Sequence, residues 1–313
     1  MDKLAAAAKQ AILGALKIKK GEEVLLVTDR QKMKLAEAFA FWCKKAGAET
    51  TTYLMTETLR PITGPTKLFA SLIENANVTL YMLDARIEEK PFRGFMVKRG
   101  GECGRICMMP GITEDMMKRL VGIDYSHLDK LGRKVISIIK NAKHVHVTNV
   151  LGTDITFSLA GRKCLNDNGD ITKKGSHGNL PAGEVYTAPV EKGFTGKLVI
   201  SLIDDAVGRG VMQFKDGDLI HATGKGIEAI LKNIGSDKTG RIVGEFGIGT
   251  NKGAKICKNM LEAEKAFGTV HFAIGDSYDL GLNKSKHHYD ALVEKASLVA
   301  DGKEILQNGK FCI

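Results

Sequence analysis

The last third of the chain contains side chains whose types and spacing could bind divalent metal ions. Residues 269–275 alternate strictly, so three large apolar side chains share one face of a strand and His271 lies on the other. We expect this histidine to face a cleft or solvent. His288 and Asp290 stand two positions apart and share a face of an extended segment. An imidazole beside a carboxylate is a common pair of metal ligands.

Two glutamates upstream stand in similar surroundings. Glu184 lies where a turn becomes a strand, and Glu245 follows the apolar pair Ile242 and Val243. A carboxylate at such a glycine-flanked strand end is costly to bury unless it is paired or bound to a cation. Taken singly, each is more simply a salt-bridged or exposed residue. Together with the two histidines and the aspartate, they match what a pair of divalent ions needs.

Four ordered sequence blocks around these residues resemble the M29 metallo-aminopeptidase family, also called the aminopeptidase T or thermophilic metalloprotease family. The agreement is strongest over about residues 150–291. The blocks are G-E-V-x-T-x-P around Glu184, E-x-G-x-G-x-N from Glu245, H-x-A-x-G-x-x-Y from His271 to Tyr278, and S-x-x-H-Y-D ending at Asp290.

The resemblance implies a metal-dependent aminopeptidase that removes N-terminal residues through a dinuclear site and an activated water. It implies metal ligands, a catalytic tyrosine and a homodimer. The ligands would be Glu184, Glu245, His271, His288 and Asp290, and the tyrosine would be Tyr278.

The roles within this set are partly open. Glu184 or Glu245 would carry a proton to the leaving amine, and which of them bridges the metals is not readable. The Tyr278 hydroxyl could donate to the developing oxyanion, or the ring could simply pack beside the site. His287 stands at a variable position of its block and is not counted as a ligand. Oxygen and nitrogen ligands suit Zn, Co or Mn.

Two other function classes fit part of the same pattern. Ring-cleaving dioxygenases that act on dihydroxypyridines resemble the same family and use one Fe(II) held by His and Asp. The presence of both Glu184 and Glu245 argues for two metals instead. A nucleic-acid-binding module would use the net charge of +10, but the basic residues are dispersed and no aromatic platform accompanies them.

Other motifs give weaker signals. Gly247 and Gly249 lack the third glycine of a dinucleotide loop, and the segment around Gly224 lacks the first glycine of a P-loop. Cys103 and Cys107 have no second pair at zinc-finger spacing. The cysteines at 43, 103, 107, 164, 257 and 312 are scattered and do not form a disulfide framework, which fits a cytoplasmic protein.

The elements that must position these residues follow two different secondary-structure patterns along the chain. Over the first 125 or so residues, buried strands such as 22–29 and 78–83 alternate with helices such as 4–16 and 32–45, which predicts a mostly parallel α/β sheet. From residue 144 the chain is β- and glycine-rich, with helices expected at 227–233 and 253–264. We predict an α/β domain over residues 1–130 and a β-rich α+β domain carrying the metal site over 131–313.

The family resemblance and the hydropathy of the sequence together predict the partners of the protein. The sequence contains no stretch of ~18 apolar residues, so it predicts no membrane-spanning helix. The expected substrates are peptides with a free N-terminus, without a nucleic-acid or membrane partner.

Overall fold

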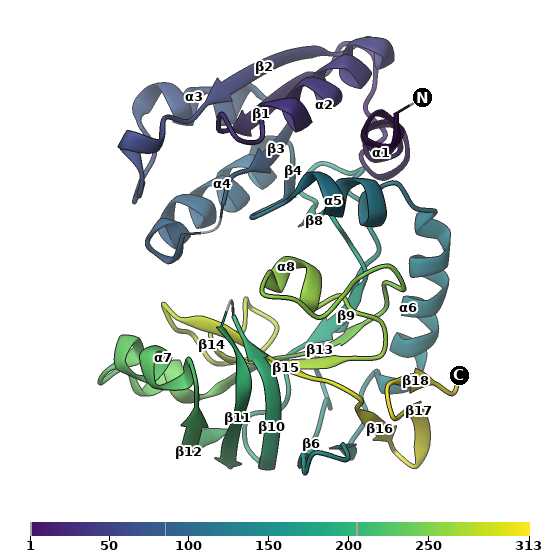
Figure 1. The fold of residues 1–313 in the computed structure, drawn as a ribbon, viewed down its shortest axis with the longest axis vertical. Helices are drawn as coiled ribbons and strands as arrows, with labels where there is room; N and C mark the ends of the chain where they lie inside the picture. Colours follow the sequence, from purple (N-terminus) through teal and green to yellow (C-terminus); the bar gives the residue numbers. More distant parts are fainter. Residues whose placement is uncertain (1, 85, 205) are drawn as a thin grey trace. The chain divides into compact units, whose positions relative to one another are not determined.

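The computed structural model describes residues 2–84, 86–204 and 206–313, and the chain divides into two compact units (Figure 1). The first unit contains the chain through Tyr125 together with Gly169–Ala182. The second contains Ser126–Asn168 and Gly183–Ile313. The segment 169–182 therefore returns to the first unit, whereas the division at residue 130 assigns it to the second domain.

The first unit is built on a parallel sheet with strand order β2-β1-β3-β4-β8. Strands β3 and β4 are buried throughout, and β1 is buried after its first residue, as strands with both faces covered must be. The predicted parallel α/β sheet is confirmed. Its strands are β1 (Glu23–Thr28), β2 (Glu49–Leu54), β3 (Val78–Met82), β4 (Arg105–Met108) and β8 (His177–Asn179).

The helices of this unit largely follow the apolar periodicity of the sequence. Helix α2 ends at Gly47, whose φ of 82° is left-handed backbone that glycine adopts without strain. The sequence pattern does not predict α4, because glycines and charges interrupt its apolar period. The helices are α1 (Lys3–Gln10, continued by a π turn at Ala11–Ala15), α2 (Met33–Ala46), α3 (Lys67–Asn75), α4 (Lys90–Cys103) and α5 (Glu114–Met116).

The second unit is built on an antiparallel sheet that has 13 strands within the described residues. Its main path runs β18-β17-β16-β5-β6-β10-β15-β14-β13-β9-β7, and β11 and β12 extend from β10. The strands are β5 (Val145–Thr148), β6 (Asp154–Phe157), β7 (Leu165–Asp167), β9 (Glu184–Thr187), β10 (Thr195–Ile203), β11 (Ala206–Lys215), β12 (Asp218–Gly224), β13 (Val243–Gly249), β14 (Val270–Gly275), β15 (His288–Val293), β16 (Ser297–Ala300), β17 (Lys303–Gln307) and β18 (Lys310–Phe311). The predicted β-rich second part is confirmed.

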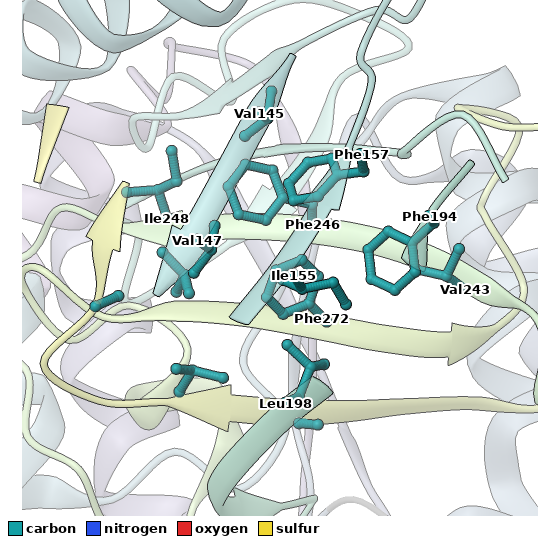
Figure 2. Packing of buried hydrophobic residues seen from close by; sticks show 14 of the residues in the cluster. Val145, Val147, Ile155, Phe157, Phe194, Leu198, Val243, Phe246, Ile248 and Phe272 are labelled. Atoms are coloured by element: carbon teal, nitrogen blue, oxygen red, sulfur yellow. The ribbon is translucent and has the colours of Figure 1, made fainter. Parts of the chain in front are cut away.

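Four phenylalanines form the centre of this unit's core (Figure 2). Phe246 of β13 and Phe272 of β14 pack on each other and on Phe157, with ring centroids 4.9–5.7 Å apart. Phe194 packs against Phe272 at 5.6 Å. Because neighbours alternate across a strand, burying these rings on one face turns Glu245 and His271 to the opposite face.

Three helices complete the second unit: α6 (Tyr125–Ile139), α7 (Ile227–Ile234) and α8 (Met260–Ala263). The prediction of a helix over 253–264 is wrong in its first half. There, the Oδ1 of Asn251 accepts from the Gly253 amide and the Glu262 carboxylate accepts from the Lys255 amide. The Ala254 amide also donates to the Asn251 carbonyl, so the segment turns at Asn251 and folds back toward Glu262 as a loop, and α8 begins only at Met260. No helix in the described part of the chain is long and apolar enough to cross a membrane.

Candidate metal centre

Four neighbouring strands of the second unit bring the predicted metal-binding residues to one face of the sheet. Strands β9, β13, β14 and β15 lie side by side and contribute Glu184, Glu245, His271, and the pair His288 and Asp290. The register sets Glu245 opposite Ala273 and Ala273 opposite Asp290. The structure therefore brings all five residues together on the face opposite the phenylalanine core.

Small residues on this face make room for the functional side chains. Ala273 separates Glu245 from Asp290 across the three strands, and its short side chain leaves the space between the two carboxylates open. Gly247 lies opposite His271, and a Cβ there would come within 2.1 Å of the imidazole Nε2. Only glycine at position 247 therefore accommodates His271 in this pose.

The first group that could hold a metal ion consists of Glu184, Glu245 and His271. The His271 Nε2 lies 3.2 Å from Glu184 Oε2 and 3.4 Å from Glu245 Oε1. Metal–ligand bonds of about 2.0–2.2 Å around a tetrahedral ion place two ligand atoms roughly 3.4 Å apart. The spacing of these atoms therefore fits ligands of one metal ion.

The second group consists of Glu245, His288 and Asp290, so Glu245 belongs to both. His288 Nε2 lies 3.5 Å from Asp290 Oδ1 and 3.9 Å from Glu245 Oε2. The Nδ1 of His288 lies 2.8 Å from the Asp276 carbonyl oxygen. That acceptor requires a proton on Nδ1, which leaves Nε2 available to bind a metal as ligand histidines commonly do.

Several buried atoms of this face are left unsatisfied. In the described part of the chain, Glu184 Oε2, Asp290 Oδ1 and His271 Nδ1 are buried without a hydrogen-bond partner. Such atoms are costly to bury unless a cation or another group compensates them. The two acceptor oxygens face the imidazoles in the two groups, so bound cations would satisfy them. The residues present therefore fit a metal centre.

The charges of the metal-free face shift the pKa values of its members. Burial alone would lower the pKa of both histidines, but the carboxylates outweigh it, raising the pKa of His288 to about 9 and that of His271 well above its usual range. Burial would likewise raise the pKa of Glu184, yet the charges of Lys265 and His271 hold it at about 2. Without metal, protonated imidazoles therefore balance the carboxylates.

The segment around α8 covers the metal-binding face. Met260 and Ala263 of α8 pack on Leu202 and Leu292. This cover leaves His271 with 0% of its surface exposed, so the expectation that it faces a cleft or solvent is wrong. Directly after α8, the buried ammonium of Lys265 lies 2.7 Å from Glu184 Oε1 and 2.6 Å from Glu264 Oε1.

The predicted catalytic tyrosine lies beside the second group. The ring of Tyr278 is 4.4 Å from that of His288, centroid to centroid, and 51% of the residue is exposed. Its φ of 47° is left-handed, an uncommon conformation for a large side chain that often marks functional sites. His287 instead lies 3.7 Å from Asp237 and belongs to neither metal-binding group.

An open groove of about 720 Å³ adjoins this region. It is lined by Asp237, Thr239, Asp276, Lys284 and Ser285 among others, but by none of the five predicted ligands. The groove meets the metal-binding face through Asp276, whose carbonyl oxygen accepts a hydrogen bond from His288 Nδ1. It is therefore a neighbouring surface and not the position of the metal.

Comparison with known protein families identifies the family of this chain. The model for the family described as thermophilic metalloprotease (M29) matches residues 126–311, more than half of the chain. The chain belongs to the M29 family. The matched range contains every residue of both metal-binding groups, as well as Tyr278 and Lys265. The predicted family is therefore confirmed, and this M29 member is assigned to a class of metal-dependent proteases.

Two solved structures share the fold of this M29 protein over nearly its whole length. One is the 2,5-dihydroxypyridine dioxygenase from Pseudomonas putida KT2440, with a TM-score of 0.78 and 14% identity, covering 99% of this chain and 98% of the other. The other is wild-type AmpT from Thermus thermophilus, with a TM-score of 0.76 and 19% identity, covering 99% of both. At these identities the likeness concerns the fold alone. A search of the curated proteins finds no match.

The structure adds residues to the M29 site that sequence reasoning does not find. Lys265 contacts Glu184, and Glu264 and Asp167 contact Lys265 in turn, with Lys265 Nζ 3.6 Å from Asp167 Oδ2. In the sequence, Glu264 and Lys265 end the charged stretch Glu262-Ala-Glu-Lys, which is typical of a solvated helix face. Only the tertiary contact with β9 shows that the lysine is buried.

Proposed function

We propose that this M29 protein is a metal-dependent aminopeptidase with a dinuclear centre. The observation that carries the proposal is the position of Glu245, whose Oε1 faces His271 and whose Oε2 faces His288. A carboxylate with one oxygen toward each of two ligand groups is placed to bridge two ions. Glu184 and His271 would complete one group, and His288 and Asp290 the other.

The side chains have distinct parts in the proposed reaction. When bound, two divalent ions polarise a scissile carbonyl and lower the pKa of a water toward neutrality. Glu184 or Glu245 accepts the proton released from the water and delivers it to the leaving amine. The Tyr278 hydroxyl donates to the oxygen that becomes negative in the transition state. Zn, Co and Mn suit these oxygen and nitrogen donors.

A metal centre also offers a way to select a free α-amine. The two metal-binding groups contain three carboxylates, and Lys265 Nζ contacts one of them. With two divalent ions bound, the site would carry a net positive charge and would not attract an ammonium group. One of the ions could instead receive the unprotonated α-amine, which a blocked terminus does not offer. This chemistry supports an exopeptidase that selects the N-terminus of a peptide.

A single-iron dioxygenase is the second candidate, since the dihydroxypyridine dioxygenase has a similar fold. One iron would need His and Asp ligands and could use His271, His288 and Asp290. That reading leaves the buried carboxylates of Glu184 and Glu245 without a purpose at the centre. Their placement in the two groups favours two metals.

The test compares a leucyl peptide that has a free amine with its N-acetylated twin. Metal-stripped protein is restored with Zn, Co or Mn, and cleavage of each peptide is measured. The proposal predicts cleavage of the free-amine peptide only, and only after metal is restored. Cleavage of neither peptide by protein shown to hold metal, together with oxygen consumption on a dihydroxypyridine after Fe(II) loading, would favour the dioxygenase instead.

A further inference from the structure

Lys265 is a buried cation in direct contact with a proposed metal ligand. Its side chain is 0% exposed, and its ammonium lies 2.7 Å from Glu184 Oε1. Glu264 Oε1 at 2.6 Å and Asp167 Oδ2 at 3.6 Å contact the same ammonium. The ammonium is thus held by three carboxylates, only one of which belongs to a metal-binding group.

Burying a lysine in this way is costly for stability alone. Charges removed from water must regain the lost hydration through their partners, and a well-packed apolar residue often does as well or better. The retention of a fully buried ammonium beside Glu184 therefore indicates a purpose connected with the metal-binding face.

The two oxygens of Glu184 are in different environments. Oε1 accepts the hydrogen bond from Lys265, whereas Oε2 lies 3.2 Å from His271 Nε2 and has no hydrogen-bond partner among the described residues. Lys265 therefore leaves only Oε2 for a metal ion. A carboxylate free of this contact could offer both oxygens to the same ion.

We propose that Lys265 is a positioning residue that makes Glu184 bind a metal ion through one oxygen only. This inference rests on the proposed function. Glu264 and Asp167 hold the ammonium in place. With one oxygen withheld, the ion at Glu184, Glu245 and His271 retains room for water or substrate, which a catalytic ion requires. Loss of Lys265 both frees Oε1 and removes a repelling positive charge. The ion should then bind at least as tightly but work less well.

The test uses Co(II) as a coloured probe in Lys265→Met, a variant of similar length without charge. Lys265→Arg keeps the cation, and Lys258→Met is the matched control at an exposed lysine of the same segment. For each full-length protein we would measure bound cobalt per chain, the visible Co(II) absorption, and kcat and KM on the free-amine peptide. Thermal unfolding checks that each variant is folded.

The proposal predicts a specific pattern among these variants. Lys265→Met retains its cobalt, its visible absorption weakens as the number of ligands rises, and kcat falls about 10–100-fold with KM little changed. Lys265→Arg recovers most of both signals, and Lys258→Met matches the wild type. If Lys265→Met does not fold, Glu264→Gln should give a smaller change in the same direction, because it loosens the ammonium from the other side.

Two results would overturn the inference: an unchanged spectrum and kcat in Lys265→Met, or loss of cobalt from that variant. The spectrum does not depend on peptide cleavage. A weakened spectrum in Lys265→Met, in protein that cleaves no peptide, would therefore contradict the aminopeptidase and still support the role of Lys265.

Discussion

Each unit of the molecule contains a buried ionic cluster, and the two clusters are composed differently. In the first unit, the side chains of Arg60 and Glu89 are 0% and 1% exposed and form a two-pronged pair, with Nε–Oε1 at 2.9 Å and Nη2–Oε2 at 2.6 Å. The Ile62 amide also donates to Glu89. Both oxygens of the buried Glu89 carboxylate are therefore satisfied, and the more exposed Glu57 adds a weaker contact 3.6 Å from Arg60 Nη1.

The metal-binding face of the second unit differs in its unsatisfied atoms, although protonated imidazoles balance its carboxylates when no metal is bound. Carboxylates of Glu184, Glu245 and Asp290 meet two imidazoles, and two of their oxygens are buried without a hydrogen-bond partner in the described residues. A cluster that serves only stability would be expected to resemble the Arg60–Glu89 pair. The excess of buried acceptors beside histidines is what distinguishes a site built for cations.

The largest expected effect comes from Glu245→Gln, because Glu245 is shared by both metal-binding groups. Loss of an outer-shell partner typically costs 10–100-fold in activity, so removal of this shared carboxylate should lower peptide hydrolysis by more than about 100-fold. Metal content should fall while the fold persists. Hydrolysis rates, metal analysis and circular dichroism would check this. Wild-type hydrolysis by the variant would contradict the assignment.

The next effect concerns Tyr278, at the edge of the same face. Tyr278→Phe removes a donor to the developing oxyanion, so kcat should fall by roughly 100-fold or more with metal content unchanged. Because the residue is half-exposed, the free energy of unfolding should change little. A kcat equal to that of the wild type would show that the ring only packs beside His288.

Glu89→Gln tests the balanced cluster of the first unit. The variant leaves the Arg60 guanidinium buried without its charged partner, which should lower the free energy of unfolding by about 3–5 kcal/mol. Urea unfolding would measure the change. Glu57→Gln is the control, since Glu57 is 46% exposed and its pairing with Arg60 should contribute less than about 1 kcal/mol. Equal losses of unfolding free energy in both variants would contradict the difference between the buried and the exposed partner of Arg60.

The pH dependence of stability should also separate the clusters. Burial would raise the pKa of Glu89, but Arg60 and the Ile62 amide outweigh it and lower the pKa, so its contribution is lost as pH falls through that lowered value. The contribution of His288 to stability changes with pH in the opposite direction. Its pKa is raised to about 9, so the contribution is complete below pH 6.5 and is lost as pH rises through about 9.

The loss of unfolding free energy at alkaline pH should depend on whether metal is bound. A bound metal ion takes the place of the His288 proton, so metal should reduce the fall in unfolding free energy between pH 6.5 and about 9. Unfolding of metal-free and metal-buffered protein at both pH values would check this, with His288→Gln as control. An alkaline loss that is identical with and without metal would place its origin outside this face.

Much of this face could be predicted because its signals are local. The alternation of residues 269–275 correctly separates His271 from the apolar core, and the β-rich texture is confirmed by the antiparallel sheet. The family also followed from four short blocks that each surround one or two functional residues.

The remainder depends on tertiary contacts that leave no local pattern. That Ala273 lies between Glu245 and Asp290 follows from strand register, and only register shows that Glu245 faces both groups. The contact of Lys265 with Glu184 joins positions 81 residues apart. The helix expected at 253–264 begins only at Met260, because the preceding segment turns at Asn251 and is held as a loop by contacts that propensity does not report.

The most direct test of the account is anomalous diffraction from crystals of the protein grown with zinc. The account predicts two peaks, one between Glu184, Glu245 and His271 and one between Glu245, His288 and Asp290, with Glu245 contacting both. A single peak held by His271, His288 and Asp290, with Glu184 and Glu245 bound to no metal, would contradict the dinuclear centre and with it the proposed aminopeptidase.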